Sequence, residues 1–176
     1  MKYWLTIIFY IFIGFIIFLI FGSIIFNMHT SGIKKALSKQ NHYIVLKFVA
    51  AELGKCSLGR VTAMEGNLTC NEITAPSVAA ATIKYFSSDE HFKNPYSPNE
   101  SAIKTETTAV YDTSGFSDTN VGYVFVQGSD KGSSSGKIII LSCFKKTCYG
   151  SENTQISIID INDKRSIRRA LESSPY

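Results

Sequence analysis

The sequence contains no acidic residue before Glu52 and no charge of either sign between Lys2 and Lys34. It also has no dense basic stripe, because its 18 Lys and Arg residues are interspersed with 14 acidic residues and the net charge is only +4. Nucleic-acid-binding surfaces gather Lys and Arg on one face, so nucleic acid is not predicted as a partner. The 176 residues suffice for one ordinary domain and an additional segment, but not for two full domains.

Groups that carry catalysis or bind metals are also scarce. The histidines are His29, His42 and His91. No two of them have the spacing of a metal site. Residues 132–136 match the letters of the nucleophile elbow G-x-S-x-G, but a strand is predicted after them and no histidine follows. We therefore predict no enzyme, no cofactor, no metal and no small-molecule substrate.

One weaker alternative concerns calcium. Asp112 and Asp118 lie in one predicted loop with Ser114 and Thr119. Calcium sites gather several oxygen ligands from such loops. A plain polar turn accounts for the same residues and is the preferred interpretation.

Residues 3–26 form a long apolar segment without charge. As an α-helix these residues would span about 36 Å, which exceeds the roughly 30 Å of a bilayer's hydrocarbon core. The segment is longer than the ~7–15 apolar residues of a signal peptide. It predicts an uncleaved transmembrane anchor within residues 1–30, in contact with membrane lipid. The residues assigned to the anchor are Tyr3, Trp4, Gly14, Gly22 and Phe26.

A second helical pattern covers residues 31–53. Apolar side chains recur there at helical spacing, which predicts that they face the domain. These positions are Ile33, Leu37, Ile44, Phe48 and Ala51, and the stripe is widened by Ala36, Tyr43, Leu46, Ala50 and Leu53. The opposite, polar face is predicted to hold Lys34, Lys35, Ser38, Asn41 and Glu52.

The remainder predicts an α+β domain. Thr74 and Pro76 are typical of the start of a short helix. Strands are predicted at residues 107–111, 121–127, 137–144 and 155–161, joined by short polar connections. The predicted fold is a long N-terminal helix, transmembrane and then amphipathic, packed on a small antiparallel sheet of about four strands. The domain would cover residues 31–163, and a basic C-terminal tail residues 164–176.

The four cysteines all follow the apolar segment, and they are Cys56, Cys70, Cys143 and Cys148. An even number in a small exported domain favours two disulfides. Proximity favours Cys56–Cys70 and Cys143–Cys148 among three connectivities. Free buried thiols and a zinc site of four thiolates are the alternatives.

The lysines near the apolar segment conflict with export. Only Lys2 precedes that segment, whereas Lys34, Lys35, Lys39 and Lys47 follow it. The positive-inside rule would then place the domain in the cytoplasm. The cysteines favour the opposite orientation, with the domain outside the cytoplasm.

The order of these elements resembles type IV pilins and type II secretion pseudopilins. The segment 41–59 looks like the end of the long helix in relatives that carry a cysteine there, and Asn94-Pro95-Tyr96 looks like the turn that precedes the sheet in many pseudopilins. The sequence differs from the family at its N-terminus, because it lacks the usual basic leader, the cleavage site and the glutamate that follows it.

The resemblance implies a membrane-anchored structural or accessory subunit of a type II secretion or type IV pilus-like system. Such a subunit would be single-pass in the bacterial inner membrane, with a periplasmic domain. Its partners would be other pilin-like subunits, contacted through the N-terminal helix. The alternative is a membrane-tethered, extracytoplasmic ligand-binding or sensory module, with a pocket lined by Tyr111, Tyr123 and Phe125.

Overall fold

The computed structural model describes residues 2–104, 116–130 and 136–174; in the first helix it describes side chains at residues 3, 12–16 and from 30 onward. The chain divides into two units, Met1–Ile33 and Lys34–Tyr176. A single helix, α1 (Lys2–Ser57), accounts for the described part of the first unit and continues into the second.

Over the residues that the structure describes, no helix includes a stretch long and apolar enough to cross a membrane.

The face that residues 34–57 of α1 turn to the domain matches the predicted one only in part. The buried positions are Ser38, His42, Val45, Leu46, Val49, Ala50, Glu52 and Leu53. Of the predicted apolar stripe, Leu46, Ala50 and Leu53 are buried, Tyr43 and Phe48 are half-buried, and the exposed positions are Ile33, Ala36, Leu37, Ile44 and Ala51. The prediction missed the rest of the buried face because it excluded polar residues from the interface. Ser38, His42 and Glu52 are buried with their hydrogen-bonding groups satisfied.

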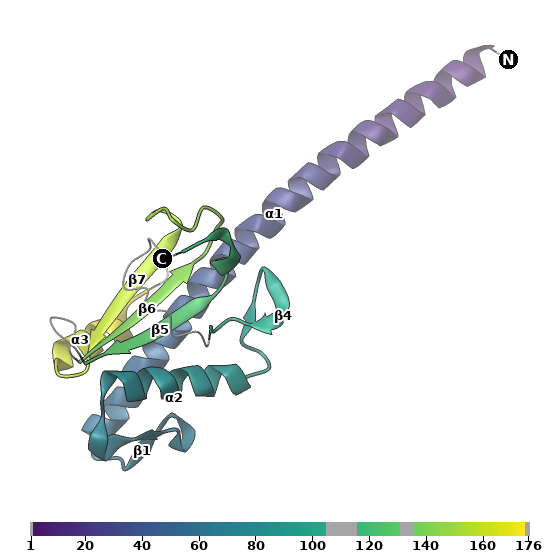
Figure 1. Cartoon of the computed structure of the whole chain (residues 1–176). Helices are drawn as coiled ribbons and strands as arrows, with labels where there is room; N and C mark the ends of the chain where they lie inside the picture. The colour runs from purple at the N-terminus through teal and green to yellow at the C-terminus, as the bar shows by residue number, and fades with distance from the viewer. Residues whose placement is uncertain (1, 105–115, 131–135, 175–176) are drawn as a thin grey trace. The chain divides into compact units, whose positions relative to one another are not determined.

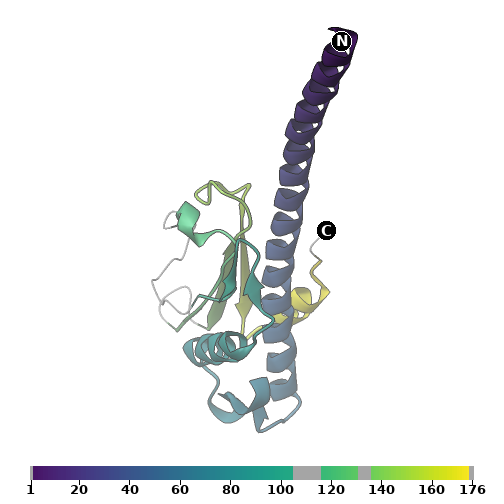
Figure 2. The same cartoon turned by 90° about the vertical axis from the view of Figure 1, so that its right-hand side faces the viewer.

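The largest sheet has three antiparallel strands in the order β5 (Val124–Ser129), β6 (Lys137–Cys143) and β7 (Thr154–Asp160). In Figures 1 and 2 these strands lie beside the part of α1 that belongs to the second unit. The central strand β6 contains the apolar run Ile138–Leu141, whose side chains are buried on both faces of the sheet.

The two faces of this sheet contribute to separate apolar clusters. One face packs with α1 and α2 through Val124, Val126, Ile138, Ile140 and Ile159. The other face packs under the segment that precedes β5, and its cluster contains Phe116, Val121, Tyr123, Phe125, Ile139, Leu141, Cys143 and Cys148. Alternate residues of β6 enter alternate clusters, as the period of a strand requires.

The predicted fold class is wrong in its sheet as well as in its membrane helix. The described residues form three separate sheets, of two, two and three strands, rather than one sheet of about four. The small sheets pair β1 (Thr62–Ala63) with β2 (Leu68–Thr69), and β3 (Lys93–Asn94) with β4 (Ser97–Ser101). A register shift in β3 and the missing N–H of Pro98 in β4 keep the second pair short. The strand predicted at 107–111 lies outside the described residues.

Helix α2 (Ala75–Ser88) begins where the sequence predicted. Thr74 caps it, and its side chain accepts a hydrogen bond from the backbone N–H of Ser77 at 3.2 Å. Gly128 of β5 permits close packing at this end, because a Cβ there would lie 1.9 Å from the carbonyl oxygen of Ala75. Asp130 accepts a hydrogen bond from the N–H of Ala75 and holds the same junction.

Helix α3 (Lys164–Glu172) is capped by Asp163, which accepts a hydrogen bond from the N–H of Arg165. Its buried residues are Ser166 and Ala170. Ser166 Oγ accepts a hydrogen bond from the N–H of Asp160 at 3.0 Å. The basic C-terminal segment is therefore part of the domain's packing against β7.

Candidate functional site

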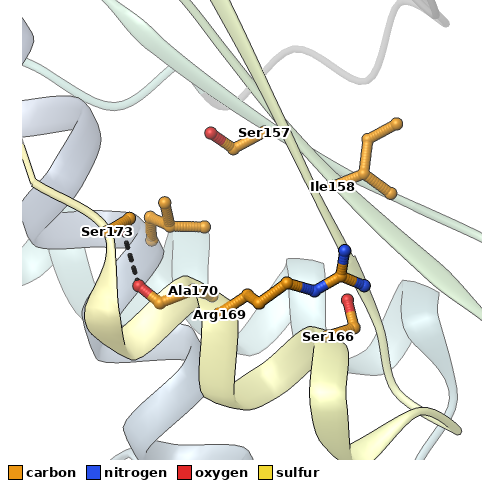
Figure 3. Close-up of a pocket in the computed structure, with 7 residues that line it drawn as sticks. Ser157, Ile158, Ser166, Arg169, Ala170 and Ser173 are labelled. Atoms are coloured by element: carbon orange, nitrogen blue, oxygen red, sulfur yellow. Dashed lines mark hydrogen bonds between the residues drawn. The ribbon is translucent and has the colours of Figure 1, made fainter.

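A cleft of about 240 Å³ lies between α1, β7 and α3 (Figure 3). It is lined by Leu46, Ser157, Ile158, Ser166, Arg169, Ala170 and Ser173. Figure 3 shows the Arg169 side chain extending from α3 across the cleft toward β7. The volume is below the ~300 Å³ at which pockets for drug-sized ligands begin, so only a small molecule or group would fit.

The serine hydroxyls of this cleft already have partners. Ser166 Oγ accepts from the N–H of Asp160, and Ser173 Oγ donates to the carbonyl oxygen of Ala170 at 2.7 Å. Ser157 Oγ lies 2.8 Å from Nε2 of His42. Arg169 therefore supplies the group best placed to recognise a ligand.

The guanidinium of Arg169 is weakly held. Its Nε donates to the carbonyl oxygen of Arg165 at 3.4 Å, and its nearest carboxylate oxygen, on Asp163, lies 3.9 Å away. A guanidinium suits carboxylate or phosphate groups. The cleft can thus accept a small anionic group beside an apolar wall.

His42 joins three elements beneath the cleft. It is fully buried in α1, with Nε2 2.8 Å from Ser157 Oγ of β7 and Nδ1 2.9 Å from Ser142 Oγ of β6. Burial lowers the pKa of His42 to about 4, so the ring is neutral near pH 7. One ring nitrogen then donates and the other accepts, and each serine hydroxyl can complement either role.

The His42–Ser157 pair resembles a catalytic base and nucleophile in distance only. A general base works best when its pKa lies near the operating pH, and burial moves His42 well below that range. The pair instead fixes α1 against the sheet. Among the described residues, no group of three or more His, Cys, Asp or Glu side chains is arranged to hold a metal ion.

The four cysteines form the two disulfides that proximity favoured. Cys56–Cys70 joins the last turn of α1 to the 3₁₀ turn Cys70–Glu72, and Cys143–Cys148 closes the turn after β6. No free thiol remains. The alternatives of free thiols and of a four-thiolate zinc site are therefore wrong.

The Asn94–Tyr96 turn is tied into the domain by its side chains. Asn94 is fully buried; its Nδ2 donates to the carbonyl oxygen of Val121, and its Oδ1 accepts from the N–H of Tyr96. The hydroxyl of Tyr96 donates to the carbonyl oxygen of Phe144 at 2.8 Å. Gly122 has φ +82 and faces Asn94, whose Oδ1 would lie 2.0 Å from an added Cβ. Pro95, which lies between Asn94 and Tyr96 in the sequence, is half-buried.

Other predicted site residues are placed as follows. Among the anchor residues, Tyr3 and Gly14 are exposed, whereas Trp4, Gly22 and Phe26 lie outside the positions whose exposure the structure describes. In the calcium alternative, Asp112 falls in 105–115, outside the described residues, and Asp118 Oδ1 accepts from the N–H groups of Thr147 and Cys148. Asp118 therefore stabilises a turn.

Two of the three residues predicted to line the pocket of the alternative hypothesis are buried in the core. Tyr123 and Phe125 are buried members of the apolar cluster on the far face of the sheet, and Tyr111 lies outside the described residues. The cleft beside Arg169 was not predicted. Sequence offered one weak signal for it, the cluster of basic residues at 164–169.

Comparison with protein-family models, with curated proteins and with solved structures finds no match to this chain.

Proposed function

We propose that this chain is a membrane-anchored, non-enzymatic structural or accessory subunit of a type II secretion or type IV pilus-like system. The observation that carries the proposal is the continuity of α1, which begins in the uncharged segment of the sequence and ends within the disulfide-bonded domain. The domain's largest apolar cluster includes residues of that same helix.

The proposed location is the bacterial inner membrane, single-pass, with the domain in the periplasm. Two disulfides and no free cysteine favour an oxidising compartment. This argument outweighs the lysines that follow the apolar segment, because the positive-inside rule expresses a bias in loop composition.

Crosslinking tests the assembly proposal. The full chain should co-purify with pilin-assembly components after mild crosslinking in cells that build such a system. Phe15→Arg should abolish that recovery, because it places a charge in the uncharged segment through which the chain is proposed to contact its partners. Phe15→Leu is the matched control and should retain it. Recovery of the unsubstituted chain only as a monomer would contradict the proposal.

Orientation is tested separately. A membrane-impermeant protease is added to right-side-out membrane vesicles, and thiols are alkylated before and after reduction. Digestion of the domain, with thiols labelled only after reduction, is the expected result. Protection from protease with four free thiols would place the domain in the cytoplasm.

The second candidate is an extracytoplasmic ligand-binding module, and the cleft beside Arg169 is the observation that favours it. It would bind a small carboxylate or phosphate. Nuclear magnetic resonance titration with acetate and inorganic phosphate should perturb the residues that line the cleft, and Arg169→Gln should remove the effect. Absence of any perturbation in the unsubstituted chain would eliminate this candidate.

A further inference from the structure

The turn after β6 and the facing part of α1 gather lysines around Phe144, which is buried. The Nζ atoms of Lys35 and Lys39 lie 5.6 and 4.8 Å from the centroid of the Phe144 ring. Lys145 and Lys146 follow Phe144 directly and are exposed. Two lysines of α1 therefore lie against Phe144, and two exposed lysines follow it in the turn.

A fifth lysine extends this surface along α1. Lys34 Nζ lies 5.7 Å from the centroid of the Tyr96 ring, and the hydroxyl of Tyr96 donates to the carbonyl oxygen of Phe144. We call the five residues the lysine cluster: Lys34, Lys35, Lys39, Lys145 and Lys146. Cation–π contact holds three of them in place while their N–H groups stay available to anions.

The turn that presents Lys145 and Lys146 is rigidly held. The Cys143–Cys148 disulfide closes it, and Asn153 Nδ2 donates to Thr147 Oγ1 at 2.8 Å. A fixed cationic surface binds with less loss of conformational entropy than a mobile one.

The charge of the cluster is not neutralised within the described residues. None of the ion pairs between them includes a member of the lysine cluster. Two described carboxylates belong to this turn or bind it: Asp118, whose Oδ1 accepts N–H bonds from the turn, and Glu152, which is exposed in the turn. Among the described residues, the lysines of the cluster therefore outnumber these carboxylates.

The same turn also carries an exposed aromatic ring. Tyr149 follows Cys148 in the turn and is 68% exposed. Tyrosine beside lysine suits the headgroup region of a bilayer, where the ring meets the interface and the ammonium groups meet lipid phosphates. The proposed membrane anchoring of the chain favours a bilayer over a soluble partner.

We propose that the lysine cluster, with Tyr149, is a docking surface for the headgroups of an anionic bilayer and fixes the domain against the membrane. This inference rests on the proposed membrane anchoring of the chain. Docking of this kind restricts the domain's orientation relative to the bilayer, whereas an anchor alone leaves it free to tilt.

The test uses the full chain in nanodiscs of phosphatidylcholine alone or mixed equally with phosphatidylglycerol. Amide hydrogen exchange is followed in the peptide that covers residues 144–150. Exchange should slow several-fold in the anionic discs, and high salt should reverse the effect. Lys145→Gln with Lys146→Gln should remove the protection, since each lysine near an anionic surface changes binding about fivefold.

The matched control is Lys164→Gln with Arg168→Gln, which removes the same charge from exposed positions of α3, at the opposite end of β7 from the turn. It should leave the protection unchanged. Equal exchange in the two kinds of disc would overturn the docking proposal.

A separate readout distinguishes failure of the anchor from failure of the docking surface. Resistance of the chain to carbonate extraction from phosphatidylcholine vesicles reports anchoring alone. A chain that is extracted, yet sediments with anionic vesicles at low salt and loses this in the Lys145→Gln/Lys146→Gln variant, supports docking without the anchor. A chain that is extracted and does not sediment overturns both.

Discussion

Within residues 34–57, the two faces of α1 differ in a way that apolar content does not explain. The face against the sheet contains Ser38, His42 and Glu52 beside its valines and leucines. The solvent face carries Leu37 and Ile44, which are 44% and 41% exposed. The helix therefore buries polar side chains while leaving large apolar ones in contact with solvent.

Specific partners explain this difference. Ser38 Oγ donates to the carbonyl oxygen of Lys34, His42 lies between two serines, and Glu52 accepts a bond from the N–H of Met64. A buried polar group that is hydrogen-bonded costs little, whereas one without a partner costs about 1–3 kcal/mol. Complementarity with β6, β7 and the 3₁₀ turn Met64–Gly66 therefore determines which face of α1 is buried.

The largest expected effect compares one substitution on both faces. Leu53→Ala, at a position 4% exposed, should destabilise the domain by about 3 kcal/mol, because it leaves a cavity in the core. Leu37→Ala should change stability by less than about 0.5 kcal/mol. Urea unfolding of the full chain in mild detergent measures both. Equal losses would show that the two faces are buried alike.

The second prediction concerns pH. The folded-state pKa of His42 is lowered from 6.5 to about 4, so between these values the unfolded chain binds the proton more readily. The neutral ring therefore contributes about 3 kcal/mol to the free energy of unfolding. This contribution is fully present above the pKa of the unfolded chain and is lost as pH falls toward 4.

The His42→Gln variant removes this pH-dependent contribution to stability, because glutamine does not titrate. The variant should be less stable than the unsubstituted chain near neutral pH. The difference between the two should shrink by about 3 kcal/mol on acidification to about pH 4. A difference that stays constant with pH would show that His42 is not buried in its neutral form.

Local signals in the sequence predicted local structure. Thr74 and Pro76 located the start of α2, and β-branched runs located β5, β6 and β7. Sequence proximity also predicted both disulfides. These features depend on neighbours in the chain, which a sequence displays directly.

Contacts between residues far apart in the chain could not be predicted from the sequence in the same way. His42 acquires its role from Ser142 and Ser157, which lie 100 and 115 residues further along the chain. The cleft beside Arg169 likewise needs α3 to pack against β7. Helical periodicity located α1 but predicted only part of its buried face, because it treats every polar residue as solvated.

The third prediction tests the polar end of the buried face. Glu52 is 6% exposed and accepts the N–H of Met64, which precedes Glu65; these two residues have φ 51 and 54. Glu52→Ala should destabilise the domain by about 2 kcal/mol, because it leaves that buried N–H without a partner in a left-handed turn.

Two further substitutions serve as controls for Glu52→Ala. Glu52→Gln keeps an acceptor oxygen and should cost less than half as much as Glu52→Ala. Glu72→Ala removes an exposed carboxylate and should change stability by less than about 0.5 kcal/mol. If Glu52→Ala matched Glu72→Ala in urea unfolding, the hydrogen bond to Met64 would contribute nothing to the fold.

The smallest expected effect belongs to the solvent face. The double substitution Leu37→Ser with Ile44→Ser replaces two half-exposed apolar side chains that lie outside the core cluster. Surface changes of this kind stay within about 0.5 kcal/mol each, so the unfolding midpoint should barely move. The midpoint should also be independent of protein concentration in both proteins. A loss of several kcal/mol, or a concentration dependence that the double variant abolishes, would mean that a second chain covers this face and that the difference between the two faces of α1 holds only for the isolated molecule.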